Sequence, residues 1–145
     1  MKIITLFKFC ILFLLILPFT ALADSAVPLA DSAVQWTATV TESHTACKNI
    51  GKDIEGVYDV ILKYGEGKTL TLMVVKSGHI FNGVVVDENP QKIKLQASYL
   101  EDAGVVTDNV NITFTSENSG TGTSKWYWSD GLMSCGGSYE FIISR

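Results

Sequence analysis

Apolar and polar residues alternate with a period of two along most of the chain after residue 33. This alternation is typical of β-strands that turn one face to a core and the other to water. The segment 92–99 is the clearest case, because its apolar residues occupy the odd positions and its polar residues the even ones. No segment has a convincing helical period. The predicted strands cover residues 34–41, 57–64, 69–75, 79–87, 92–99, 110–115, 126–128 and 139–143.

These strands predict an all-β fold, an antiparallel meander of about eight strands. An up-and-down β-barrel, or a strongly curled sheet, would hide both edges of the meander. The alternative is a two-sheet β-sandwich, which needs longer crossover connections. The short turns between residues 55 and 100 favour the barrel. Residues 117–123 are rich in Ser, Gly and Thr and are expected to form a flexible loop before the short aromatic strand.

The beginning of the chain has the pattern of a secretory signal peptide. Lys2 and Lys8 supply a positive start, and residues 9–17 form an unbroken apolar run. Pro18 then breaks the helix, and Ala21-Leu22-Ala23 places small residues where signal peptidase cleaves. A membrane anchor is the competing interpretation, but a span needs about 20 apolar residues. We therefore expect cleavage after residue 23.

The predicted organisation is a removed signal peptide (1–23), a flexible linker (24–33) and a single all-β domain (34–145). The linker contains most of a short repeat, because Leu22 to Val27 recurs word for word as Leu29 to Val34. No later segment is long and apolar enough to span a bilayer. We expect an exported, soluble protein that is periplasmic or extracellular.

Loss of the signal peptide makes the protein more acidic. The full chain has eleven Lys and Arg against fifteen Asp and Glu, and only Lys2 and Lys8 lie in the segment removed. The mature net charge is therefore near −6. This charge argues against a nucleic-acid partner, which would be met by a basic face. It equally disfavours adhesion to an anionic membrane surface.

Cleavage also leaves an even number of cysteines. Cys10 departs with the signal peptide, so that Cys47 and Cys135 remain. A cysteine pair in an exported chain predicts a disulfide bond. A metal site built on the same pair would need further ligands, and His44 is the only candidate nearby. No metal is predicted.

An aromatic segment, Trp126-Tyr127-Trp128, is the candidate binding site. In a strand the two tryptophans share one face and Tyr127 takes the other. One face is expected to fill the core. The other either packs beneath a loop or is exposed, and an exposed Trp or Tyr is a common means of binding sugars, peptides or proteins. Both interpretations of the segment stay open at this point.

The sequence offers little catalytic chemistry. His44 and His79 are the two histidines, and both are expected to be exposed loop residues. No nucleophile motif such as G-x-S-x-G accompanies them. The acidic stretches 87–89 and 108–109 could offer oxygen ligands to calcium, but they lack the D-x-D-x-D-G loop. No catalytic residue and no cofactor are predicted.

The chain has one general resemblance to known proteins, which rests on its strand count, its length and the segment Gly56-Val57-Tyr58. In these respects the chain resembles small secreted barrels of the lipocalin and avidin kind, which hold a ligand in the barrel mouth. No family motif extends over the chain, so neither a ligand nor a site residue is transferred from the likeness.

Three functions from different classes follow. The main prediction is a non-enzymatic binding protein that takes a small ligand, a glycan or a protein in the barrel mouth or on the loops. The alternative is a structural or assembly component of the envelope, which would form oligomers. The third is a hydrolase that uses His44 or His79. The sequence leaves the ligand and the oligomeric state undetermined.

Overall fold

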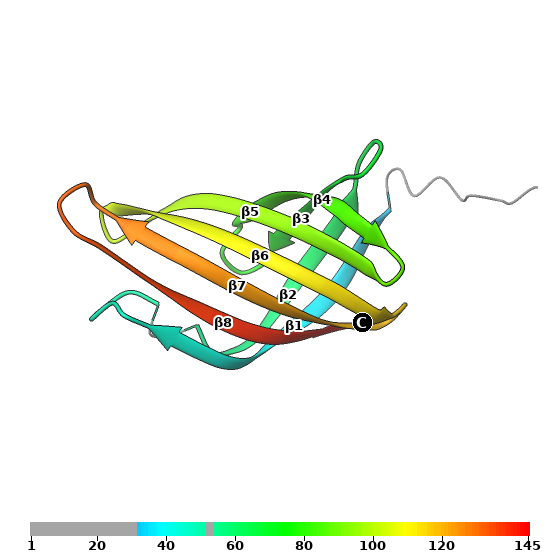
Figure 1. Cartoon of the computed structure of the whole chain (residues 1–145), viewed down its shortest axis with the longest axis horizontal. Helices are drawn as coiled ribbons and strands as arrows, with labels where there is room; N and C mark the ends of the chain where they lie inside the picture. Colours follow the sequence, from blue (N-terminus) through cyan, green and yellow to red (C-terminus); the bar gives the residue numbers. More distant parts are fainter. Residues whose placement is uncertain (1–31, 52–53) are drawn as a thin grey trace, which may run out of the picture.

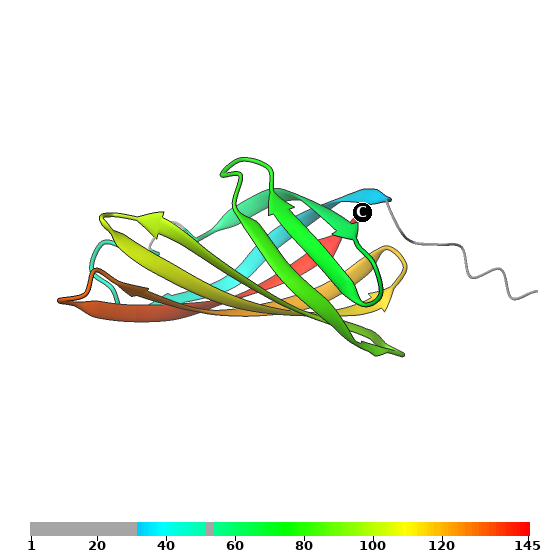
Figure 2. The same ribbon diagram turned by 90° about the horizontal axis from the view of Figure 1, so that it is seen from above.

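The protein is an eight-stranded antiparallel β-barrel in which the last strand closes against the first. The computed structural model describes residues 32–51 and 54–145. Each strand pairs with its neighbours in the sequence, and the strands wrap around one long axis (Figures 1 and 2). The strands are β1 (Ala33–Thr45), β2 (Gly56–Tyr64), β3 (Thr69–Val74), β4 (Ile80–Glu88), β5 (Gln91–Glu101), β6 (Gly104–Ser116), β7 (Ser119–Ser129) and β8 (Ser134–Ser144).

The predicted all-β fold is confirmed, and of the architectures considered the barrel is the one formed. The predicted signal peptide (1–23) and residues 24–31 of the predicted linker lie outside the described residues. β1 begins at Ala33, one residue before the predicted start of the domain. Within the described ranges there is no helix of the length and apolarity needed to cross a membrane.

The predicted flexible loop at residues 117–123 is wrong, because β7 already begins at Ser119. The inward positions of this half of the strand are Gly120 and Gly122, so the apolar alternation that marks a strand is missing. Space explains the glycines: a Cβ on Gly122 would lie 2.0 Å from the Phe141 ring of β8. The Phe141 side chain of the neighbouring strand β8 fills the space beside Gly122.

One end of the barrel is filled by side chains. Trp36 of β1 packs on Phe114 of β6 with 5.1 Å between ring centroids, and both are buried. The guanidinium of Arg145 lies 5.2 Å from the centre of the Trp36 ring, and its Nε donates to Asn118 Oδ1 at 2.8 Å. The start of β1 and the carboxyl terminus both lie at this end (Figure 1). We call it the closed end.

The opposite end, which we call the open end, carries the β1–β2, β3–β4, β5–β6 and β7–β8 connections. The predicted disulfide is confirmed there: Cys47, just after β1, is bonded to Cys135 of β8, with 5.4 Å between their Cα atoms. A small second core surrounds the bond and contains Ile50, Val106 and the two tryptophans of β7. The segment that follows β1 is thereby fastened against β8.

Removal of this disulfide should lower the free energy of unfolding. In a Cys47→Ala/Cys135→Ala variant we expect a loss of about 2–5 kcal/mol, because the bond restricts an unfolded chain over a long loop. The two cysteines are 88 residues apart. Urea unfolding followed by circular dichroism measures the loss. Reducing agent should destabilise the wild type and leave the stability of the variant unchanged. Equal stability of wild type and variant without reducing agent would contradict a stabilising Cys47–Cys135 disulfide.

Candidate ligand-binding cavity

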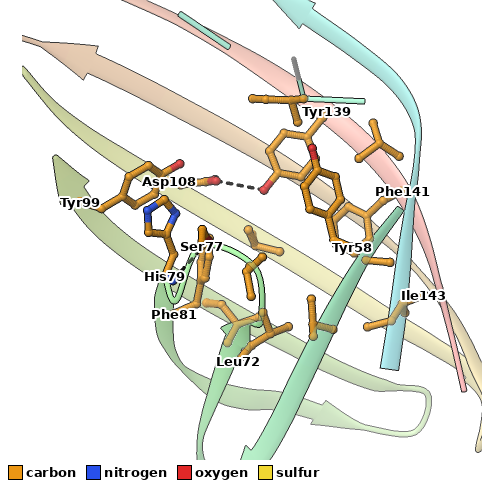
Figure 3. A pocket seen from close by; sticks show the side chains of 17 residues that line it. Tyr58, Leu72, Ser77, His79, Phe81, Tyr99, Asp108, Tyr139, Phe141 and Ile143 are labelled. Atoms are coloured by element: carbon orange, nitrogen blue, oxygen red, sulfur yellow. Dashed lines mark hydrogen bonds between the residues drawn. The ribbon is translucent and has the colours of Figure 1, made fainter. Parts of the chain in front are cut away.

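The barrel interior contains a cavity of about 230 Å³ between the closed end and the second core. Its wall is mostly apolar and comes from seven of the eight strands, all but β7, and from two connections (Figure 3). It reaches the surface beside the β3–β4 turn, because Ser77 is both exposed and part of the wall. The lining residues are Ala38, Val40, Ile54, Tyr58, Val60, Leu72, Val74, Ser77, His79, Phe81, Leu95, Tyr99, Asp108, Val110, Tyr139, Phe141 and Ile143.

Strand alternation places these side chains in the cavity. Along β5, Leu95 and Tyr99 are separated by Ala97, and all three point inward in phase. Along β8, Tyr139, Phe141 and Ile143 do the same. The small side chain of Ala38, facing inward from β1, is one reason why the space stays unfilled. The cavity is the part of the interior that the inward-facing residues do not occupy.

A carboxyl group lies in this apolar wall. Asp108 of β6 is 2% exposed, and its inward position is in phase with Val106 and Val110. Ser124 Oγ of β7 donates a hydrogen bond to Asp108 Oδ1. Tyr139 of β8 donates its hydroxyl hydrogen to Asp108 Oδ2 at 3.0 Å (Figure 3). Two neighbouring strands thus hold the carboxyl group in place.

The surroundings of Asp108 act on its ionisation. Burial raises the pKa of the Asp108 carboxyl above its ordinary value, because the charged form loses its hydration. The hydroxyl groups of Ser124 and Tyr139 and the nearby imidazole of His79 oppose that rise. Burial, followed by the charge of Asp108, raises the pKa of Tyr139. The same two causes, with Glu101 in addition, raise the pKa of Tyr99.

The two histidines occupy different environments. His44 is exposed, as expected, and lies 2.9 Å from Glu42 Oε1, but it belongs to strand β1 and not to a loop. His79 differs from that expectation: it is half-buried at the cavity wall, stacked on Tyr99 with 3.8 Å between ring centroids. The histidines are thus not brought together. Among the described residues, no group of three His, Cys, Asp or Glu side chains is placed to hold a metal ion.

The aromatic segment of β7 is not part of the cavity. Trp126 and Trp128 are 5% and 6% exposed and belong to the second core, while Tyr127 points outward and is 53% exposed. Trp128 Nε1 donates to the backbone carbonyl of Glu101 at 2.7 Å. Gly137 of β8 makes room for the other indole, since a Cβ there would lie 2.6 Å from the Trp126 ring. The two tryptophans pack beneath the Cys47 segment, and Tyr127 alone faces outward.

Sequence reasoning missed the polar centre of the cavity. The sequence pattern predicts a strand that starts at Val110 and leaves Asp108 and Asn109 in an acidic stretch before it, whereas β6 begins at Gly104. The available signal was the phase of the alternation: Val106, Asp108 and Val110 are two residues apart, so the carboxylate shares the apolar face. A charged residue in the buried phase of a strand is a functional candidate, because burial of a charge is costly.

Comparison of the chain with protein-family models, curated proteins and solved structures found no significant match. The geometry of the cavity is therefore the basis on which function is inferred. That geometry combines a mostly apolar wall, an exposed turn residue, Ser77, at its edge and one carboxyl group held by two hydroxyl donors.

The raised pKa of Asp108 should make stability depend on pH. In the unfolded chain the group ionises near its ordinary value of 3.8, whereas the native state retains the proton to higher pH. The contribution of Asp108 to stability therefore falls as pH rises from about 4 to the native pKa. We expect the free energy of unfolding of Asp108→Asn, minus that of the wild type, to increase between pH 4 and pH 7. Urea unfolding at several pH values measures it.

Asp87→Asn is the matched control. Hydrogen bonds from the backbone of Asn89 and from Lys92 lower the pKa of exposed Asp87, so its contribution is lost only as pH falls below about 4. The difference between this variant and the wild type should change little between pH 4 and pH 7. A constant difference for Asp108→Asn over the same range would contradict the assignment of a raised pKa.

Proposed function

We propose that this protein is a non-enzymatic binding protein that holds a small, largely apolar molecule inside its barrel. The supporting observation is the 230 Å³ cavity, with its apolar wall and its single carboxyl group. Ligand sites in proteins are usually concave and apolar, with a few placed polar groups that fix orientation. The cavity has this composition, and its wall is built mainly from the paired strands of a closed barrel.

The cavity is large enough to matter energetically. Protein interiors are close-packed, and voids larger than a water molecule are few. A dry void of 230 Å³ would cost on the order of 5 kcal/mol by the cavity term of buried cores. That cost is a large part of the total stability of a small domain. A larger residue in place of Ala38 would reduce this cost, and the retained space is accounted for if a ligand fills it.

The volume also limits the ligand. An apolar cavity of roughly 150 Å³ accommodates benzene, and this cavity is about half as large again. Molecules with one aromatic ring and a short side chain, or with a short alkyl chain, match that size. Because the three tryptophans do not line the cavity, calorimetry is a more direct readout of binding than intrinsic tryptophan fluorescence.

Two valines of β6 provide a matched test of the proposal. Val110 points into the cavity and Val105 points outward, 45% exposed. Phenylalanine at position 110 should occupy the space that a ligand needs, whereas phenylalanine at position 105 should not. With 2-phenylethanol, indole and hexanol as probes, we expect isothermal titration calorimetry to show binding to the wild type and Val105→Phe. Val110→Phe should bind at least about tenfold more weakly.

The midpoint of thermal unfolding of each variant shows whether its fold is intact. If none of the probes binds the wild type, or if a folded Val110→Phe protein binds them as tightly as the wild type, the interior is not the binding site.

We also propose that the protein acts after export. Support comes from the Cys47–Cys135 disulfide, since such bonds persist in oxidising compartments, and from the signal-peptide pattern of residues 1–23. When the full chain is expressed in a bacterial host, the exported product should have the intact mass of a chain that begins at Asp24 with no free thiol. An uncleaved chain that stays in the cytosol would contradict this proposal.

A further inference from the structure

Asp108 gives the cavity a negative centre with no Lys or Arg beside it in the described part of the wall, where His79 is the one imidazole. Among the described residues that line the cavity there is one carboxyl group and no Lys or Arg. The titratable groups that face Asp108 are His79 beside β4, Tyr99 of β5 and Tyr139 of β8; Ser124 of β7 faces it with a neutral hydroxyl. In the described part of the chain, His79 is stacked on Tyr99 and makes no ion pair with Asp108.

The carboxylate retains capacity to accept hydrogen bonds. An ionised carboxylate has about four acceptor positions on its two oxygens. Ser124 occupies one position on Oδ1 and Tyr139 occupies one on Oδ2. Each oxygen can therefore accept a further hydrogen from a donor in the cavity. A donor that also carries a positive charge would offset the cost of keeping the ionised group away from water.

Aromatic rings surround the same region. Tyr58, Tyr99, Tyr139, Phe81 and Phe141 all line the cavity, and Figure 3 shows Asp108 between the His79–Tyr99 pair and Tyr139. The faces of aromatic rings carry partial negative charge and attract cations. A carboxylate among such rings suits a compact ammonium group, and it disfavours an anionic ligand by like-charge repulsion.

We infer that the ligand is a small amphiphilic amine, whose ammonium group binds the Asp108 carboxylate while its apolar part fills the cavity. This inference rests on the proposed function and specifies the ligand class for the same site. The ammonium donates to the free acceptor positions of the carboxylate, and the ring or alkyl chain extends along Val110, Leu95 and Leu72 toward the closed end.

Three probes with a phenyl ring and a short chain test the ligand class: 2-phenylethylamine, 2-phenylethanol and phenylacetate. Titration calorimetry on the disulfide-bonded protein at pH 7.5 should give an affinity for the amine at least about tenfold above that for the alcohol, because a charge-assisted hydrogen bond replaces a neutral one. Phenylacetate should bind more weakly than the alcohol.

In Asp108→Asn the preference for the amine over the alcohol should disappear, while binding of the alcohol persists. Asp102→Asn is the control: it removes one negative charge from the exposed β5–β6 turn, where the positive φ of 46° is one that Asn tolerates. The control should keep the tenfold preference.

A second measurement decides the case if Asp108→Asn does not fold. Lowering the pH from 7.5 to 4 shifts the carboxyl group toward its protonated form, because burial raises its pKa, so the amine-to-alcohol affinity ratio of the wild type should fall toward one. Histidine also gains charge in this range, and the same titration in His79→Gln isolates the carboxylate.

Equal affinities for amine and alcohol at pH 7.5, or a preference that survives in folded Asp108→Asn or at pH 4 in His79→Gln, would overturn the inference while leaving the proposed function standing. If none of the three probes, nor indole or hexanol, binds the wild type, the proposed function fails and the inference with it.

Discussion

The pairing of β1 with β8 is the interaction on which the rest of the structure depends. It turns a meander into a closed barrel, so that one face of every strand points into a single interior. An eight-stranded barrel encloses a space that side chains can just fill or that can hold one small ligand. Here both occur: Trp36 and Phe114 fill one end, and the space beyond them stays open around Asp108. The cavity follows from closure combined with the sizes of the inward residues.

The parts of the fold that could be predicted are those with a local signal. Residues 92–99 alternate cleanly, and β5 is found there with the apolar side chains inward. A local sequence pattern does not show how residues that are far apart in the sequence share the space inside the barrel. Gly120 and Gly122 of β7 face the barrel interior, where the Ile143 side chain lies beside Gly120 and the Phe141 ring lies beside Gly122. The stretch therefore looks like a loop, although it is a strand.

The candidate site was predictable only in part, for the same reason. The inward phase of Tyr99 and Tyr139 is evident from alternation, but their position beside Asp108 depends on which strands become neighbours. The aromatic segment of β7 attracted attention by its composition, yet its tryptophans pack in the second core. There they help the Cys47–Cys135 bond to hold the open end, next to Tyr99 and Tyr139. The tryptophans thus support the cavity from outside it.

The central claim is that the barrel interior is a binding site with Asp108 as its polar anchor. A crystal structure of the protein grown with 2-phenylethylamine tests that claim most directly. We expect the phenyl ring to lie inside the barrel and the nitrogen to lie within hydrogen-bond distance of the Asp108 carboxylate. An interior without the amine at saturating concentration, or an amine nitrogen directed away from Asp108, would contradict it.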